Sequence, residues 1–167
     1  MTVRRCIPWP DKRLRTKAEE VEAVTDEIRA IWDDMSDTME AMPGVGLAAP
    51  QIGIMLRLAV VDGSLERGHA VRLANPEIID ASSEIRPHEE ASPNLPGVSA
   101  KFERPRVVLV RYMDDNGMIT RREFSDLEST SVQHQIDHLN GRMYFDNLSK
   151  LKRDVLLRKA RKVAKSD

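Results

Sequence analysis

Two histidines four residues apart, His134 and His138, have the spacing of a metal-binding pair. Residues at this spacing lie one turn apart on the same face of a helix, so both imidazole rings can reach one ion. The pattern H-E-x-x-H is typical of metallohydrolases, in which the glutamate between the histidines is the general base. Here that position is Gln135, whose amide keeps the size of glutamate but cannot accept a proton. The stretch therefore predicts a metal-binding helix without its central proton acceptor.

The neighbours of the two histidines indicate that this helix packs inside the protein. Val132, Ile136 and Leu139 surround them with aliphatic side chains. Buried imidazoles need polar partners, and a metal ion is one such partner. Gln133 and Asp137 could orient the ligands, although a solvated charge is the alternative for Asp137. A second alternative is that the pair consists of core histidines that bind no metal.

The composition predicts one globular domain over residues 1–167. The chain is 41% hydrophobic and 32% charged, with a formal net charge of −1. This balance gives no overall reason to bind DNA or a membrane, and no apolar run is long enough to span one. The first ten residues lack the apolar region of a secretory signal. The single Cys6 excludes an internal disulfide and fits a reducing compartment, so we expect a cytoplasmic protein.

Two helices are predicted at the N-terminal end, over residues 11–18 and 25–42. Asp11 and Thr25 are suited to cap them. The second helix has apolar residues at helical spacing, which indicates a core-facing stripe, and it should stop at Pro43. Residues 44–51 are small and are expected to form a loop in which glycines permit close backbone approach.

The middle of the chain reads as strands and the end as helices. Residues 87–105 contain four prolines and are predicted to be irregular. Residues 115–117, Asp-Asn-Gly, form a hairpin-turn signal. The predicted strands cover residues 57–62, 71–75, 78–79, 106–112 and 119–124, and the predicted helices 127–139 and 148–164. Helices, then antiparallel strands, then helices indicate an α+β fold.

Three motifs in order resemble those of the polypeptide deformylases. They are GVGLAAPQ at residues 44–51, EEASPNLP at 89–96 and QHQIDHLNG at 133–141. The family carries G-x-G-L-A-A-x-Q, E-G-C-L-S-x-P and Q-H-E-x-D-H-L-x-G, and the resemblance covers nearly the whole chain. It implies a peptide-deformylase-like fold with antiparallel sheets around a central metal-site helix.

The resemblance also implies an activity. Members of the family remove the formyl group from N-formylmethionine at the start of new proteins. A divalent metal, usually ferrous iron, is held by two histidines and one cysteine, and its water attacks the formyl carbon. The glutamate moves the proton, while a glutamine and a backbone N–H beside the cysteine stabilise the oxyanion.

Several residues fall on family positions. The two metal-ligating histidines correspond to His134 and His138, and the oxyanion glutamine to Gln51. Gly46 falls where the backbone approaches substrate, and Glu90 and Arg104 where the family has an ion pair. The walls of the methionine pocket would be Val45, His88, Leu127, Thr130 and Ser131, a more polar set than the family's.

Three departures affect one reaction centre. The ligand cysteine falls on Ser92, whose neutral hydroxyl is a poor ligand for iron or zinc. The next residue is Pro93, which has no N–H to give to an oxyanion. The base falls on Gln135. We therefore expect lost or strongly reduced deformylase activity, and either weak binding of iron, zinc or nickel at His134, His138 and Ser92 or no metal.

Two other functions remain open at this stage. Glu89 or Glu90 could replace the cysteine as third ligand in an active hydrolase with another substrate. The protein could instead act by binding, either to a nascent peptide N-terminus or to the ribosome through its basic last helix. That helix carries Lys150, Lys152, Arg153, Arg158, Lys159, Arg161, Lys162 and Lys165. A solvated helix whose cations favour its C-terminal dipole is the alternative.

Overall fold

The structure is a computed structural model that describes residues 1–42 and 44–166. Its elements in chain order are η1 (Lys12–Arg15), α1 (Asp26–Ala41), β1 (Gly46–Ala48), η2 (Ala49–Ile52), β2 (Leu58–Val61), β3 (Val71–Ala81), β4 (Ile85–Ser92), β5 (Leu95–Pro105), β6 (Val107–Met113), β7 (Ile119–Ser125), α2 (Asp126–Leu139), η3 (Tyr144–Asn147) and α3 (Lys150–Ser166). Helices and antiparallel strands are mixed, so the α+β prediction is confirmed.

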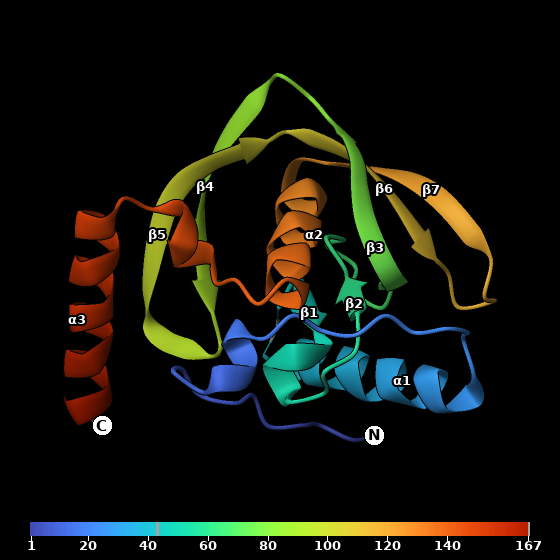
Figure 1. The fold of residues 1–167 in the computed structure, drawn as a ribbon, viewed down its shortest axis with the longest axis horizontal. Helices are drawn as coiled ribbons and strands as arrows, with labels where there is room; N and C mark the ends of the chain where they lie inside the picture. Colours follow the sequence, from blue (N-terminus) through green and yellow to red (C-terminus); the bar gives the residue numbers. More distant parts are fainter. Residues whose placement is uncertain (43, 167) are drawn as a thin grey trace.

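Two antiparallel sheets flank the central helix α2 (Figure 1). One has five strands in the order β1-β2-β3-β6-β7, and the other is the β4–β5 hairpin. Helix α2 contacts β1, β2 and β7 on one side and β5 on the other. Helix α1 packs under β1 and β2, and α3 lies outside β5. The predicted metal-site helix therefore occupies the middle of the molecule.

Helix α1 forms where the sequence predicts it. The Thr25 hydroxyl accepts a hydrogen bond from the backbone N–H of Ile28 (3.3 Å), and acidic residues follow in the first turn, where the helix dipole favours them. The predicted stripe is buried at Ile28, Trp32, Met35 and Met39 against the β-sheet. The predicted stop at Pro43 lies outside the described residues.

Helix α2 is buried almost all round, although ten of its 14 side chains are polar. From Ser129 to Leu139 only Asp137 is not buried. Its apolar residues Val132 and Ile136 pack against the five-stranded sheet. A buried polar side chain costs free energy unless it is hydrogen-bonded. Helix α2 therefore places polar groups inside the protein in addition to packing against the sheet.

The prediction of an irregular segment over residues 87–105 is wrong, because this segment forms most of the β4–β5 hairpin. In a two-stranded sheet each strand has a free edge. A proline whose missing N–H would face that edge removes no ladder hydrogen bond. Pro87, paired with Glu103, and Pro105, paired with Ile85, therefore do not break the strands.

Three shorter predictions also change. Residues 71–75 and 78–79 are one strand, β3, whose pairing with β6 is irregular next to Asn75 and Pro76. The first helix is only the 3-10 turn η1, capped by Asp11. The small-residue loop at 44–51 contains β1 and most of η2. No helix among the described residues is both long and apolar enough to cross a membrane.

Candidate functional site

Helix α2 brings His134 and His138 together as predicted. Their Nε2 atoms are 3.1 Å apart, and the rings meet edge to face. His134 Nδ1 lies 2.7 Å from Glu90 Oε1 on β4. A carboxylate can only accept, so Nδ1 of His134 carries a proton. In the neutral form of His134 its Nε2 accepts, and His138 donates across the pair.

His138 has no second partner. It is 1% exposed, and its Nδ1 atom has no hydrogen-bond partner among the described residues. Burial, together with the neighbouring His134, keeps the pKa of His138 well below its ordinary value, so the ring is neutral. A polar atom buried this deeply without a hydrogen-bond partner costs folding free energy.

A buried cluster of charges supports His134 from behind. Arg104 on β5 donates to both carboxylate oxygens of Glu90 (2.6 and 3.0 Å) and to Asp137 of α2 (2.9 Å). Burial alone would raise the pKa of Glu90, but hydrogen bonds from His134 and Arg104 lower it to about 2. The Glu90–Arg104 pair is where the resemblance places it. Asp137 contacts Arg104 rather than a histidine, so it is neither a ligand-orienting group nor a free charge.

His88 is not in the predicted pocket. Its Nε2 atom contacts Glu90, its Nδ1 lies 3.0 Å from the carbonyl oxygen of Arg86, and its ring packs on Phe102. The reason is the alternation of β4, which turns His88 and Glu90 to the same buried face. The carboxylate then holds the imidazole inside the charge cluster, away from the cleft.

A cleft of about 430 Å³ opens beside the histidine pair. It lies between β1, the β4–β5 turn and α2. The predicted site residues that line it are Val45, Gly46, Gln51, Ser92, Leu127, Thr130, Ser131, His134 and Gln135. Met42, Pro96 and Val98 line it as well and were not predicted. His138 lies behind His134 and does not line the cleft.

Packing favours a glycine at position 46, in addition to the approach of backbone to substrate that the family resemblance implies. A Cβ atom at this position would lie 2.4 Å from the Ser131 hydroxyl and 2.6 Å from the Gln135 amide nitrogen. Ser131 also donates to the carbonyl oxygen of Val45 (2.9 Å). A larger residue at this position would therefore displace the Ser131 and Gln135 side chains, which line the cleft.

Gln51 and Ser92 are tied to each other by a residue that the sequence reasoning missed. The Gln51 side chain accepts from the Ala48 N–H (2.9 Å) and donates to Asn94 Oδ1 (2.8 Å) and more weakly to Ser92 Oγ (3.5 Å). Ser92 in turn donates to Asn94 (3.1 Å). Both amide hydrogens of Gln51 are therefore engaged within the protein.

Asn94 also holds the N-terminal segment. Its amide nitrogen donates to the carbonyl oxygens of Ile7 (2.6 Å) and Gln51 (3.0 Å). It is 1% exposed, at the turn of the β4–β5 hairpin. An asparagine after a proline is an ordinary turn signal, so only the tertiary contacts reveal its role.

Gln135 is the polar group that the cleft presents without a partner. The side chain is buried, lines the cleft, and its Oε1 atom has no hydrogen-bond partner among the described residues. A primary amide both donates and accepts hydrogen bonds but takes up no proton near neutral pH. It can therefore hold a polar ligand but cannot act as a general base.

The side chains present do not fit a three-ligand metal site. Two nitrogens on one tetrahedral ion would be about 3.3 Å apart, close to the separation of the two Nε2 atoms. A third ligand is missing: the Ser92 hydroxyl bonds to Asn94, and Glu90 lies on the far side of His134. Glu89 turns outward to Ser99. Within residues 1–42 and 44–166 no three His, Cys, Asp or Glu side chains are grouped to hold an ion.

A metal would also require the other tautomer of His138. Ligation through Nε2 moves the ring proton to Nδ1, and the proton there normally needs an acceptor. None faces this atom in the described part of the chain. The alternative with Glu89 or Glu90 as third ligand is thus not supported by the structure.

The comparisons with known proteins agree with the fold. The family model described as polypeptide deformylase matches residues 3–154. The chain is 43% identical to a protein named peptide deformylase from Afipia carboxidovorans, over 99% of this chain and 98% of that protein. A crystal structure of peptide deformylase from Ehrlichia chaffeensis has a TM-score of 0.92 at 35% identity, covering 99% of both chains. One from Legionella pneumophila has a TM-score of 0.91 at 36% identity, covering 98% and 96%.

The charge cluster gives a pH-dependent prediction. Glu90→Gln leaves the buried Arg104 with Asp137 as its remaining carboxylate partner and should cost about 3–5 kcal/mol of unfolding free energy at neutral pH. The pKa of Glu90 is lowered from 4.5 to about 2, so its contribution is present above pH 4.5 and lost as the pH falls toward 2. The difference in unfolding free energy between wild type and variant, measured by urea unfolding, should become smaller as the pH falls from 4.5 to about 2.

Glu84→Gln is the matched control. Glu84 also pairs with an arginine, Arg106 (2.9 Å), but both side chains are exposed. Its loss should cost less than about 1 kcal/mol. Equal effects of the two variants, or a gap that is constant with pH, would contradict the role given to Glu90.

Proposed function

The chain belongs to the polypeptide deformylase family, and we propose that its cleft binds peptide N-termini while deformylase activity is lost or strongly reduced. The observation that carries the proposal is Gln135. It stands between the paired histidines on the cleft wall, where an amide replaces the family's proton-moving carboxylate. The cleft remains, but the group that must take a proton from water is missing.

The loss of the general base at position 135 is expected to reduce the rate strongly by itself. General base catalysis contributes roughly 10²–10⁴ in rate. Neither imidazole of the pair is a ready substitute, because His134 and His138 hydrogen-bond to each other and His138 does not line the cleft. The buried Glu90 is bound on the far side of His134. Glu89 also lines the cleft, but its carboxylate accepts a hydrogen bond from Ser99 (2.5 Å).

The oxyanion side of the reaction is weakened independently. Pro93 has no backbone N–H. The amide hydrogens of Gln51 are engaged by Asn94 and Ser92. One missing oxyanion donor costs roughly 10²–10³ in rate. Such losses do not add cleanly, but together they place turnover far below that of an intact centre.

Metal binding is expected to be weak for the same reason. The family's ion is held by three side chains and supplies an activated water. Here two neutral imidazoles remain, and the Ser92 hydroxyl is occupied by Asn94. Iron, zinc or nickel would therefore bind with low affinity or not at all.

The cleft keeps the features that binding needs. Met42, Val45, Val98 and Leu127 offer aliphatic contacts for an apolar side chain such as methionine. Gln135 offers an acceptor, Oε1, that has no hydrogen-bond partner in residues 1–42 and 44–166. A peptide that donates an N–H there would satisfy a buried polar atom that is otherwise unpaired.

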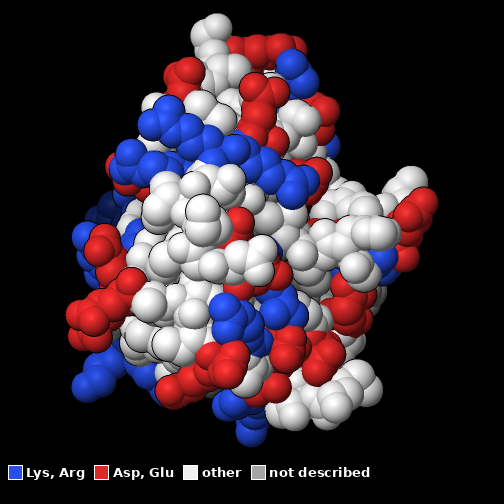
Figure 2. All heavy atoms as spheres, turned by 90° about the vertical axis from the view of Figure 1, so that its right-hand side faces the viewer, with Lys and Arg blue, Asp and Glu red and all other residues white. Residues whose placement is uncertain are grey.

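Ribosome docking through α3 is a second candidate, which rests on the charge of that helix. It has eight basic residues and one acidic residue, and the ion pair it forms within the described residues is Arg153 with Asp146 (3.8 Å). The right-hand side of the molecule in Figure 1, opposite α3, shows Lys and Arg mixed with Asp and Glu (Figure 2). The excess of basic residues on α3 can attract phosphates.

Restoring the three altered residues tests the loss of catalysis. Gln135→Glu, Ser92→Cys and Pro93→Leu together should raise kcat/KM on formyl-Met-Ala peptides by at least roughly 10³-fold in the presence of iron, nickel or zinc. Adding His134→Ala should remove the gain, because the restored centre still needs both imidazoles. Wild-type turnover within about tenfold of an ordinary family member would contradict the proposal.

Retained binding is tested separately by calorimetry with a formyl-Met-Ala peptide. Wild type should bind without turnover, and Leu127→Lys should weaken binding about tenfold or more by placing a charge on the apolar wall. Leu65→Lys is the control, because Leu65 is fully exposed and does not line the cleft. Absence of binding by wild type, or equal losses in both variants, would rule out a peptide-binding cleft.

Docking is tested by co-sedimentation with ribosomes. Lys150→Glu with Arg158→Glu reverses two exposed charges on α3 that do not line its contact with β5. The variant should sediment less with ribosomes, and wild-type binding should fall with rising salt. Failure of wild type to co-sediment at low salt would remove this candidate.

A further inference from the structure

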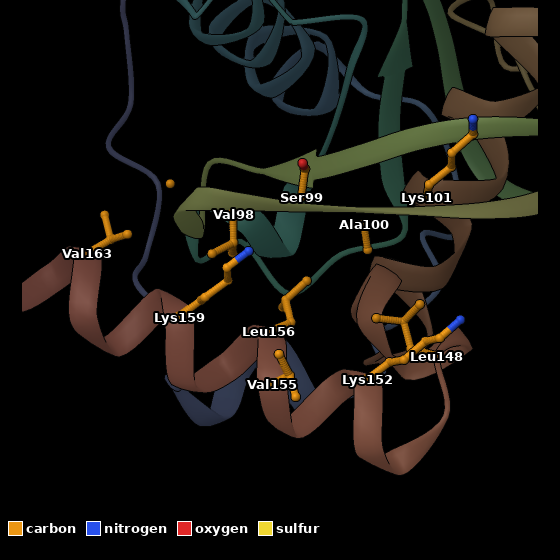
Figure 3. Close-up of a pocket in the computed structure, with 11 residues that line it drawn as sticks. Val98, Ser99, Ala100, Lys101, Leu148, Lys152, Val155, Leu156, Lys159 and Val163 are labelled. Carbon is orange, nitrogen blue, oxygen red and sulfur yellow. The ribbon is translucent and has the colours of Figure 1, made fainter.

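A groove of about 590 Å³ runs between β5 and α3, away from the histidine pair (Figure 3). Its floor is aliphatic, formed by Val98 and Ala100 of β5 with Val155 and Leu156 of α3. Val163 closes one end by packing against Gly97. The two elements come so close there that a Cβ atom on Gly97 would lie 2.5 Å from Cγ1 of Val163. The other end is open.

The groove continues beyond its open end. A second cavity of about 550 Å³ follows the same strand and shares Lys101, Leu148 and Lys152 with the first. Together they form a channel along β5 that is long compared with a single side chain. This shape fits an elongated ligand such as a peptide segment.

Two lysines of α3, Lys152 and Lys159, rim the aliphatic floor. Figure 3 shows Lys159 reaching over Val98 and Lys152 near the open end, while Lys101 of β5 points to the side of the strand away from α3. No carboxylate of residues 1–42 and 44–166 lies within 4.0 Å of the ammonium groups of these lysines. Uncompensated cations around an apolar surface complement a ligand that is both anionic and aliphatic.

We infer that this groove binds an acidic peptide segment with aliphatic side chains, supplied by a partner protein. Its carboxylates would meet Lys152 and Lys159, and its aliphatic side chains would cover the floor between β5 and α3. Val155 is 44% exposed without a partner, so a segment seated there removes apolar surface from water. The family match ends at residue 154, so most of the α3 wall lies outside the matched region.

A nucleic acid suits the groove less well. Its phosphates would find the lysines, but single-stranded bases bind by stacking on aromatic rings. The groove between β5 and α3 has no aromatic ring in its lining, and its continuation along β5 has one, Phe102, which already packs on His88. The aliphatic floor would then stay exposed, which favours a peptide over RNA.

The test uses the full chain and a fluorescein-labelled peptide in which glutamate alternates with leucine. Anisotropy should show saturable binding that weakens as salt rises. Lys152→Glu with Lys159→Glu should reduce affinity about tenfold or more, since attraction becomes repulsion. Lys150→Glu with Arg158→Glu changes the charge equally at similar places along α3 but outside the groove, and should change affinity by less than about threefold.

The ligand side has matched controls as well. Replacing the leucines of the peptide by serine should abolish binding if the floor is used. Circular dichroism checks that each variant is folded. If the variant with Lys152→Glu and Lys159→Glu is not folded, Lys152→Gln with Lys159→Gln replaces it and should show a smaller loss of affinity.

Three results would overturn the inference: no binding by wild type at low salt, equal losses in the groove and control variants, or tighter binding of a single-stranded RNA than of the peptide. Absence of binding would show that the groove is not a binding site. Equal losses would show that binding depends only on overall charge, and tighter RNA binding would show that the surface binds nucleic acid.

Discussion

The buried ion pair of Glu90 and Arg104 is the interaction on which the arrangement of the site depends. It joins β4 to β5, and through His134 and Asp137 it joins both strands to α2. Two charges removed from water are tolerated only when hydrogen bonds satisfy them, and here the pair is also bound by His88, His134 and Asp137. Because the pair fixes the hairpin against the helix, it sets where the cleft opens. None of this requires a metal ion.

The same constraint explains how the scaffold can outlast the chemistry. The groups that position α2, namely Glu90, Arg104 and Gly46, serve packing and charge balance as well as any reaction. By resemblance to the family, Gln135, Ser92 and Pro93 stand at the positions of its base, its metal-binding thiolate and its backbone donor. These three residues are neutral and fit the space. The proposed loss of activity is therefore compatible with a cleft that remains.

Local patterns in the sequence predicted the helices and the histidine pair. Apolar spacing placed α1, and the four-residue spacing placed His134 beside His138. The hairpin at 85–105 could not be predicted in this way, because its prolines are tolerated only through a pairing that spans the segment. His88 was misplaced for a similar reason, since its partner Glu90 is buried by contacts far away in sequence. The network of Asn94 and the groove beside α3 likewise exist only after the elements pack.

The metal content of the purified protein tests the central claim most directly. With two neutral imidazoles and no third ligand, we predict well below one iron, zinc or nickel ion per chain after dialysis, measured by elemental analysis. Ser92→Cys, which returns an anionic ligand, should retain more metal than wild type under the same conditions. A stoichiometric ion that survives dialysis in wild type would contradict the account, because the site would then hold its metal without the cysteine.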